Sequence, residues 1–267
     1  MNIIDVHSHI LPKVDDGSED IGMSIEMAKM YLENGIKKVI ATPHYIEGSM
    51  DNSLEGNILG LERLKKGLYK EGLELEVFLG NEIYVSMDIF KYLDEKRVST
   101  LNNTRYVLLE LPMYDIPLYM EELLYEIQLK GLIPIIAHPE RNTKIIENPN
   151  ILYKYIEKGA LAQLNLPSLE NRYGSQVKST AVTLLEHNMI HFVGTDAHTN
   201  RHRSPNMKKG IKLLRNILSQ EDFNNITYRN AQNLLDNKIL NIKEPVKYKA
   251  KNNIFTFLND KIKRVVL

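Results

Sequence analysis

The sequence predicts an α/β protein in which parallel strands alternate with helices around a closed or distorted barrel. About seven short apolar runs have the character of strands, and segments with helical spacing separate them. Strands that alternate with helices of ten or more residues form βαβ units and a parallel sheet. Several of these runs end on His, Asp or Glu. Because barrel active sites lie at the carboxyl ends of the strands, these side chains are expected to share one pocket.

The expected strands are short, apolar and mostly preceded by a Gly or an Asn. They lie near residues 2–7, 37–42, 75–80, 106–110, 133–137, 161–165 and 191–195.

The expected helices show apolar residues at helical spacing and stop at a Gly or an Asn. Residues 18–34 illustrate the pattern, with acidic residues in the first turn and Gly35 as the stop. The remaining helices are expected at 51–71, 117–130, 149–158, 175–187, 206–217 and 228–240.

An open, doubly wound sheet is the main alternative to the barrel. That fold usually carries a Gly-rich phosphate loop after its first strand, whereas this chain reads HSHILPKVDDGS there, without G-x-G-x-x-G. The barrel is therefore favoured, and residues 1–240 are expected to form it. Residues 241–267 lack a strand that ends on a possible ligand, and they are expected to pack on the same domain or to form a docking tail.

The composition restricts the classes of function. The 267 residues include 34 Lys or Arg and 34 Asp or Glu, so overall charge gives no reason to expect nucleic acid as a partner. The absence of Cys excludes disulfides, thiolate metal sites and a cysteine nucleophile. Neither a signal peptide nor an apolar run of the ~18 residues needed to span a membrane is found, so a cytoplasmic protein without an integral membrane segment is expected.

The ends of the strands offer nitrogen and oxygen ligands for metal ions. His7 and His9 are two residues apart on an extended segment, so their side chains point the same way. Read alone, an H-x-H pair is more often a polar strand end, and Glu110 alone could pair with Arg105. Imidazole and carboxylate ligands without sulfur favour Mn, Fe or Zn. The complete set of candidates is His7, His9, Asp16, His44, Glu82, Glu110, His138, Asp196 and His198.

Six segments in order along the chain resemble one known family. They are IIDVHSHILPKVDDGSED at the start, TPHY at 42–45, GNEIY at 80–84, LLELP at 108–112, AHPER at 137–141 and GTDAH at 194–198. These segments are similar to the PHP-superfamily, manganese-dependent protein-tyrosine phosphatases of bacterial capsule and exopolysaccharide operons, the CpsB/CapC/YwqE-like family. The resemblance implies a distorted (β/α)7 barrel of PHP type and a three-ion site, usually manganese-activated.

The same resemblance implies how the ligands divide among three ions. The first ion would take His7, His9, Glu82 and Asp196; the second would share Glu82 with Glu110 and His138; the third would take Asp16, His44 and His198. Asp15 is then expected in the turn or behind a ligand.

Two arginines complete the implied site. Arg141 of HPER matches a phosphate-contacting arginine, and the second such arginine falls on Arg203, with Arg201 close by as the alternative. The expected reaction is hydrolysis of a phosphate monoester by a metal-activated hydroxide, and tyrosinate, with a pKa of ~10, is a tolerable leaving group. Four aromatic side chains are candidates for contact with a phenol ring, and each is equally consistent with packing: Tyr45, Tyr84, Tyr114 and Tyr173.

The expected function is therefore a metal-dependent phosphotyrosine-protein phosphatase. The implied partner is the phosphotyrosine tail of a cognate bacterial tyrosine kinase that controls polysaccharide biosynthesis. The first alternative is histidinol-phosphate phosphatase or another small-molecule phosphoesterase. A non-catalytic module of the same fold would have lost ligands, and a nuclease is disfavoured by the neutral charge. The sequence leaves the oligomeric state, the general acid and the native metal open.

Overall fold

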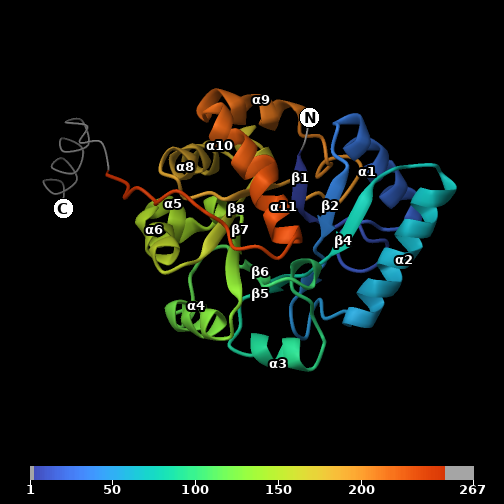
Figure 1. Cartoon of the computed structure of the whole chain (residues 1–267), viewed down its shortest axis with the longest axis horizontal. Coiled ribbons are helices and arrows are strands. Elements are labelled where there is room, and N and C mark those ends of the chain that lie inside the picture. Colours follow the sequence, from blue (N-terminus) through green and yellow to red (C-terminus); the bar gives the residue numbers. More distant parts are fainter. Residues whose placement is uncertain (1–2, 250–267) are drawn as a thin grey trace, which may run out of the picture.

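The structure, a computed structural model, describes residues 3–249 of the chain. Figure 1 shows the strands in the middle of the molecule with helices around them. The strands are β1 (Ile4–Ser8), β2 (Lys38–Ala41), β3 (His44–Tyr45), β4 (Glu76–Leu79), β5 (Glu82–Tyr84), β6 (Tyr106–Glu110), β7 (Ile133–Ala137), β8 (Leu161–Asn165) and β9 (Phe192–Gly194).

All pairs of neighbouring strands are parallel, and they follow the order of the chain. One sheet runs β1-β2-β4 and the other runs β3-β5-β6-β7-β8-β9. Backbone hydrogen bonds continue across the break between the sheets, from Gly80 N to Ala41 O (2.8 Å) and from Glu82 N to Pro43 O (3.1 Å). The nine strands therefore form seven runs, two of them interrupted. One interruption falls at Pro43, which has no N–H to donate to a ladder.

The last run meets the first at the carboxyl ends of the strands. His9 N donates to Ala197 O (2.9 Å), and Asp196 N donates to His7 O (2.9 Å). The buried carboxylate of Asp5 adds a side-chain link, since it accepts hydrogen bonds from the backbone N–H of Thr195 (3.0 Å) and from the hydroxyl of Tyr31 (2.7 Å). The prediction of a distorted parallel barrel is confirmed, and the open doubly wound sheet is excluded by this strand order.

The helices occupy most of the expected ranges. They are α1 (Ile21–Glu33), α2 (Leu54–Lys70), α3 (Ile89–Asp94), α4 (Met120–Leu129), α5 (Thr143–Glu147), α6 (Asn150–Glu157), α7 (Leu166–Leu169), α8 (Ser175–Glu186), α9 (Lys208–Ile217), α10 (Gln220–Asn224) and α11 (Asn230–Leu235). Short 3₁₀ turns lie at Leu101–Asn103 and Pro139–Arg141, and a π-helix spans Asn225–Arg229.

Helix ends explain where the predictions succeeded and failed. Gly35 follows α1 with a φ of 74°, a left-handed conformation that favours glycine, so the predicted stop is confirmed. The helix itself begins later than predicted because Asp20 caps it by accepting a hydrogen bond from Met23 N. The prediction of a helix at 228–240 was wrong at its C-terminal end, since α11 stops at Leu235. Helices α3, α5, α7 and α10 are too short to show a helical period and were not predicted.

The apolar core has two layers, and the smaller one fills the barrel. Ile135 faces this inner cluster and its neighbour Ile136 faces the outer one, as expected for side chains that alternate along a strand. Ala231 and Leu234 of α11 belong to the inner cluster. Helix α11 therefore closes one end of the barrel, and the polar side chains collect at the other.

Residues 241–248 run along the outside of the domain. Val246 N donates to His187 O (2.8 Å), Tyr248 N donates to Asn150 Oδ1 (2.9 Å), and the rings of His187 and Tyr248 lie 5.4 Å apart. The rest of the predicted extension, residues 250–267, lies outside the described residues. Within residues 3–249, no helix is long and apolar enough to cross a membrane.

Candidate metal centre

The nine predicted ligands lie together at the carboxyl end of the barrel. Glu82 is at the middle, with its carboxylate oxygens 3.0 Å from His7 Nε2, 3.0 Å from His44 Nδ1 and 2.8 Å from His138 Nε2. Three overlapping sets have ligand atoms within 4.8 Å of one another: His7–His9–Glu82, His44–Glu82–Glu110 and His9–Asp16–His44–His198.

These sets differ in detail from the expected division among three ions. His9 joins the set around Asp16, with its ring centroid 3.9 Å from that of His198, and His44 lies beside Glu82 as well as beside Asp16. The carboxylate of Asp196 lies 3.8 Å from His7 Nε2, within reach of the first set as expected. His9, His44 and Glu82 are thus positioned between sets, as bridging ligands would be.

Hydrogen bonds behind the imidazoles fix which nitrogen faces the centre. His7 Nδ1 lies 2.8 Å from Gln163 Oε1, His9 Nδ1 lies 2.6 Å from Asp15 Oδ2, and His198 Nδ1 lies 3.0 Å from the Asp196 carbonyl. Each acceptor requires a proton on Nδ1, so each ring presents the lone pair of Nε2 to the centre. Such outer contacts orient metal-binding histidines and raise their basicity.

The interior of the centre has more hydrogen-bond acceptors than donors, as a site that binds cations would have. The Nε2 atoms of His7 and His9 lie only 3.1 Å apart although both rings already donate through Nδ1. Among the described residues, His44 Nδ1, Glu82 Oε2 and His198 Nε2 are buried and make no hydrogen bond of good geometry, although His44 Nδ1 lies 3.0 Å from Glu82 Oε2 and His198 Nε2 lies 3.3 Å from Asp16 Oδ1. Buried polar atoms are rarely left unpaired, so the donor set fits divalent cations.

The charge balance leads to the same conclusion. Five carboxylates face two guanidinium groups, which leaves an excess of three negative charges when every carboxylate is ionised and the imidazoles are neutral: Asp15, Asp16, Glu82, Glu110 and Asp196 against Arg141 and Arg203. Burial and the charge of Glu82 raise the pKa of Glu110 to about 8. Burial alone would raise the pKa of Asp196 too, but the positive charge of His7 in its protonated form and of Arg203 lowers it far below its usual range. Divalent cations would offset this excess charge and release the proton from Glu110.

Unusual backbone geometry places several of these groups. His138 and Asp196, at the ends of β7 and β9, have φ values of 31° and 52° in the left-handed region, which non-glycine residues seldom adopt. Such strain is concentrated at functional sites. Gly17 allows the loop after β1 to pass close to His9, since a Cβ at Gly17 would lie 2.2 Å from His9 O. The glycine of the DDG sequence is therefore required for this packing.

Two arginines reach the centre from neighbouring loops. Arg141 Nη1 donates to Asp196 Oδ2 (2.8 Å), and Arg203 Nη2 donates to Asp196 Oδ1 (2.7 Å). Both guanidinium groups are partly exposed, so a bound anion can reach them. Arg201, the alternative to Arg203, is exposed, and its backbone N–H donates to Thr199.

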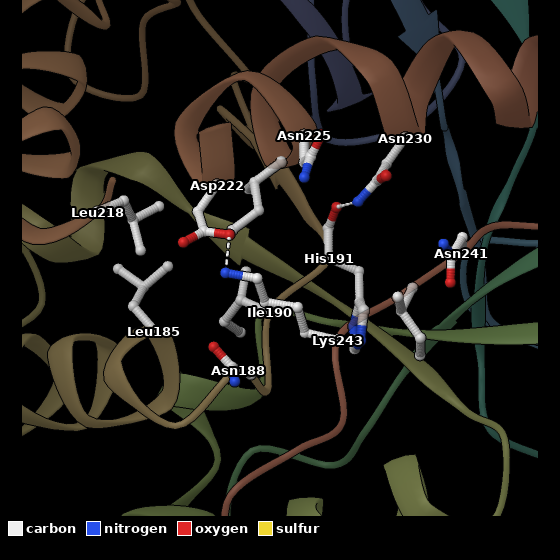
Figure 2. A pocket seen from close by; sticks show the side chains of 12 residues that line it. Leu185, Asn188, Ile190, His191, Leu218, Asp222, Asn225, Asn230, Asn241 and Lys243 are labelled. Carbon is white, nitrogen blue, oxygen red and sulfur yellow. Dashed lines mark hydrogen bonds and ion pairs between the residues drawn. The ribbon is translucent and has the colours of Figure 1, made fainter. Parts of the chain in front are cut away.

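The remaining histidines do not join the centre. His191 lies just before β9, at the end of the barrel away from the ligands, and lines a cavity of about 60 Å³. Figure 2 shows this cavity, where Asp222 pairs with Lys243 and Asn230 donates to the His191 carbonyl. Burial lowers the pKa of His191 to about 4. His187 is the C-cap of α8, and His202 is exposed in a loop.

Two supporting side chains on β8 were not among the predicted site residues. Gln163 contacts His7, and its Nε2 donates to Asn165 Oδ1 (2.9 Å), while Asn165 Nδ2 donates to Asp196 (2.8 Å). Both are fully buried. The available signal was the pair of amides in the otherwise apolar run ALAQLN, because a buried amide needs polar partners.

Comparison with known proteins identifies the family. The sequence profile described as capsular polysaccharide synthesis, CpsB/CapC, matches residues 3–236. The chain belongs to the CpsB/CapC family. This confirms the resemblance found in the six sequence segments.

Named members of the family agree with the predicted class of enzyme. The tyrosine-protein phosphatase YwqE of Bacillus subtilis is 39% identical over 96% of this chain and 100% of its own length. The putative tyrosine-protein phosphatase CapC of Staphylococcus aureus is 36% identical over 74% of this chain and 79% of its own length. A solved structure from work on YwqE of B. subtilis and CpsB of Streptococcus pneumoniae, described as metal-dependent tyrosine phosphatases, superposes with a TM-score of 0.88. It is 39% identical and covers 92% of this chain and 100% of that chain.

Proposed function

We propose that this chain is a metal-dependent phosphotyrosine-protein phosphatase. The observation that supports the proposal most is the convergence of nine imidazole and carboxylate side chains, with two arginines, at one end of the barrel. Its relatives named as tyrosine-protein phosphatases support the same reaction. We assign the nine side chains as metal ligands, and Arg141 and Arg203 as phosphate-binding residues.

A phosphate monoester needs positive charge on its oxygens and an activated water. Divalent cations in this site would supply both, since they withdraw charge and lower the pKa of bound water. Arg141 and Arg203 bind the non-bridging oxygens through charge-assisted hydrogen bonds, for which the planar guanidinium group is suited. Asp15 and Gln163 hold His9 and His7 in the tautomer that leaves Nε2 free. Tyrosinate can leave without a protonating side chain because its pKa is only ~10.

We further propose manganese as the native metal, in a three-ion cluster, with iron or zinc as possible occupants. Imidazole and carboxylate ligands without thiolates suit all three metals. The proposed substrate is the phosphotyrosine tail of a bacterial tyrosine kinase in polysaccharide synthesis, encountered in the cytoplasm. The family's description as capsular polysaccharide synthesis supports this setting. Residues 1–240 would form the barrel domain and 241–267 its extension.

Release of phosphate from phosphotyrosyl peptides, with and without added manganese, tests the proposal. We expect turnover that depends on the metal. Histidinol phosphate in the same assay tests the alternative substrate. Much faster cleavage of histidinol phosphate, or equal rates with and without metal in chelator-treated protein, would contradict the proposed function.

A further inference from the structure

The side chain of Tyr173 lies against the guanidinium group of Arg141. Tyr173 belongs to the segment 170–174 between α7 and α8, and its ring centroid is 4.7 Å from Arg141 Cζ. The guanidinium group is also held from a second side, because Arg141 Nη1 donates a hydrogen bond to Asp196. Arg141 is therefore held between an aromatic face and a carboxylate of the metal centre.

The same segment also contacts the loop that carries Arg203. Arg172 donates a hydrogen bond to the carbonyl of His202, which directly precedes Arg203. Glu170 Oε1 accepts from the backbone N–H of Gly210 (2.9 Å), near the start of α9. Residues 170–174 thus contact both Arg141 and the loop that carries Arg203, although they supply none of the nine ligands.

We propose that Tyr173 is a positioning residue, whose ring keeps Arg141 turned toward the metal centre so that it is ready to bind the phosphoryl group. The inference rests on the proposed function only in taking phosphate as the ligand of Arg141. A cation over an aromatic face is attracted by the ring quadrupole, and more strongly where water is partly excluded. Burial and the charge of Asp196 raise the pKa of Tyr173, so its ring stays neutral. Because Arg141 Cζ lies over the ring of Tyr173, the contact is with the ring face rather than with the hydroxyl.

The ring of Tyr173 should strengthen phosphate binding because it orders the Arg141 side chain beforehand. A free arginine side chain samples many rotamers, and ordering it on binding weakens the affinity for the ligand. The Tyr173 ring removes part of that freedom before phosphate arrives. Tyr114 is a suitable control, because it also follows a barrel strand but is 79% exposed.

Binding of inorganic phosphate to the manganese-loaded protein, measured by titration calorimetry, tests this role without turnover. Tyr173→Leu should weaken phosphate binding about threefold to tenfold. Tyr173→Phe, which keeps the ring, should bind within about twofold of the wild type, as should Tyr114→Leu. Equal affinity of Tyr173→Leu and wild type, or a Phe variant as weak as the Leu variant, would overturn the proposal.

A double-mutant cycle with Arg141→Ala shows whether Tyr173 acts through the arginine. In the Arg141→Ala background, Tyr173→Leu should have no further effect on phosphate affinity; additive losses would overturn the role. If Tyr173→Leu raises KM for a phosphotyrosyl peptide while phosphate affinity is unchanged, the ring contacts the substrate directly and the proposal is wrong. A wild type that binds phosphate but hydrolyses no phosphotyrosyl peptide would refute the proposed function and leave this inference intact.

Discussion

Replacing Asp15 by asparagine should weaken divalent-cation binding while leaving the barrel folded. Asp15 accepts three hydrogen bonds: Oδ2 from His9 Nδ1 (2.6 Å) and His44 N (3.0 Å), and Oδ1 from Gly17 N (3.0 Å). Asparagine has one carbonyl oxygen, so in either orientation its NH₂ group faces at least one of these donors. The variant also loses the charge that stabilises the His9 tautomer.

The size of the effect follows from the position of Asp15 behind a ligand. Removing the outer partner of a metal-binding histidine typically lowers metal affinity by about tenfold to hundredfold, which is about 1.4 to 2.7 kcal/mol. Asp15 itself is expected to bind no metal, in contrast to the neighbouring Asp16, whose Oδ1 lies 3.3 Å from His198 Nε2.

The assay is competition for manganese against a fluorescent chelator, with circular dichroism as the check on folding. Asp20→Asn is the matched control, because Asp20 lies in the same loop and only caps α1, a role that asparagine fills equally well. A folded Asp15→Asn protein with wild-type manganese affinity would contradict this prediction, since His9 would then need no carboxylate behind it.

Four further predictions concern the centre and the core. Glu82→Gln should lower the manganese content, measured by metal analysis, because its carboxylate contacts four imidazoles and belongs to two of the three ligand sets. Arg141→Ala should lower kcat/KM for a phosphotyrosyl peptide about a hundredfold at unchanged metal content; unchanged kinetics would remove its assigned role. Chelating the metal should lower the Tm of the wild type, because a cation present at a hundred times its Kd raises the free energy of unfolding by about 2.7 kcal/mol. Burial lowers the pKa of His191 from 6.5 to about 4, so His191 favours folding at neutral pH and loses this contribution as the pH falls from 6.5 toward 4. In urea unfolding of metal-free protein, the free energy of unfolding of His191→Gln should fall by roughly 3 kcal/mol less over that pH range than that of the wild type. Parallel pH profiles of the two proteins would contradict this.

The positions of the strands could be predicted because each is an apolar run, and most follow a glycine or an asparagine that ends the preceding helix. The ligand candidates followed from the same pattern, since β6 ends at Glu110 and β7 is followed by His138. The interruption between β2 and β3 has a signal in the sequence, Pro43, whereas the interruption between β4 and β5 could not be foreseen, because it depends on how neighbouring strands pair.

Contacts between residues distant in sequence were also beyond prediction. Gln163 lies 156 residues from His7, and Tyr173 meets Arg141 through a loop whose path no local pattern specifies. Their roles depend on tertiary packing. The end of α11 was missed for a similar reason, because Asn237, with a φ of 55°, turns the chain out of the helix and accepts a hydrogen bond from Arg105 N.

Anomalous diffraction at the manganese edge, from crystals of the manganese-supplied protein, would show directly whether cations bind among the nine side chains. We expect manganese peaks at the carboxyl end of the barrel, between the imidazoles of His7 and His198 and beside the carboxylate of Glu110. No peak there, or manganese bound only elsewhere on the protein, would contradict it.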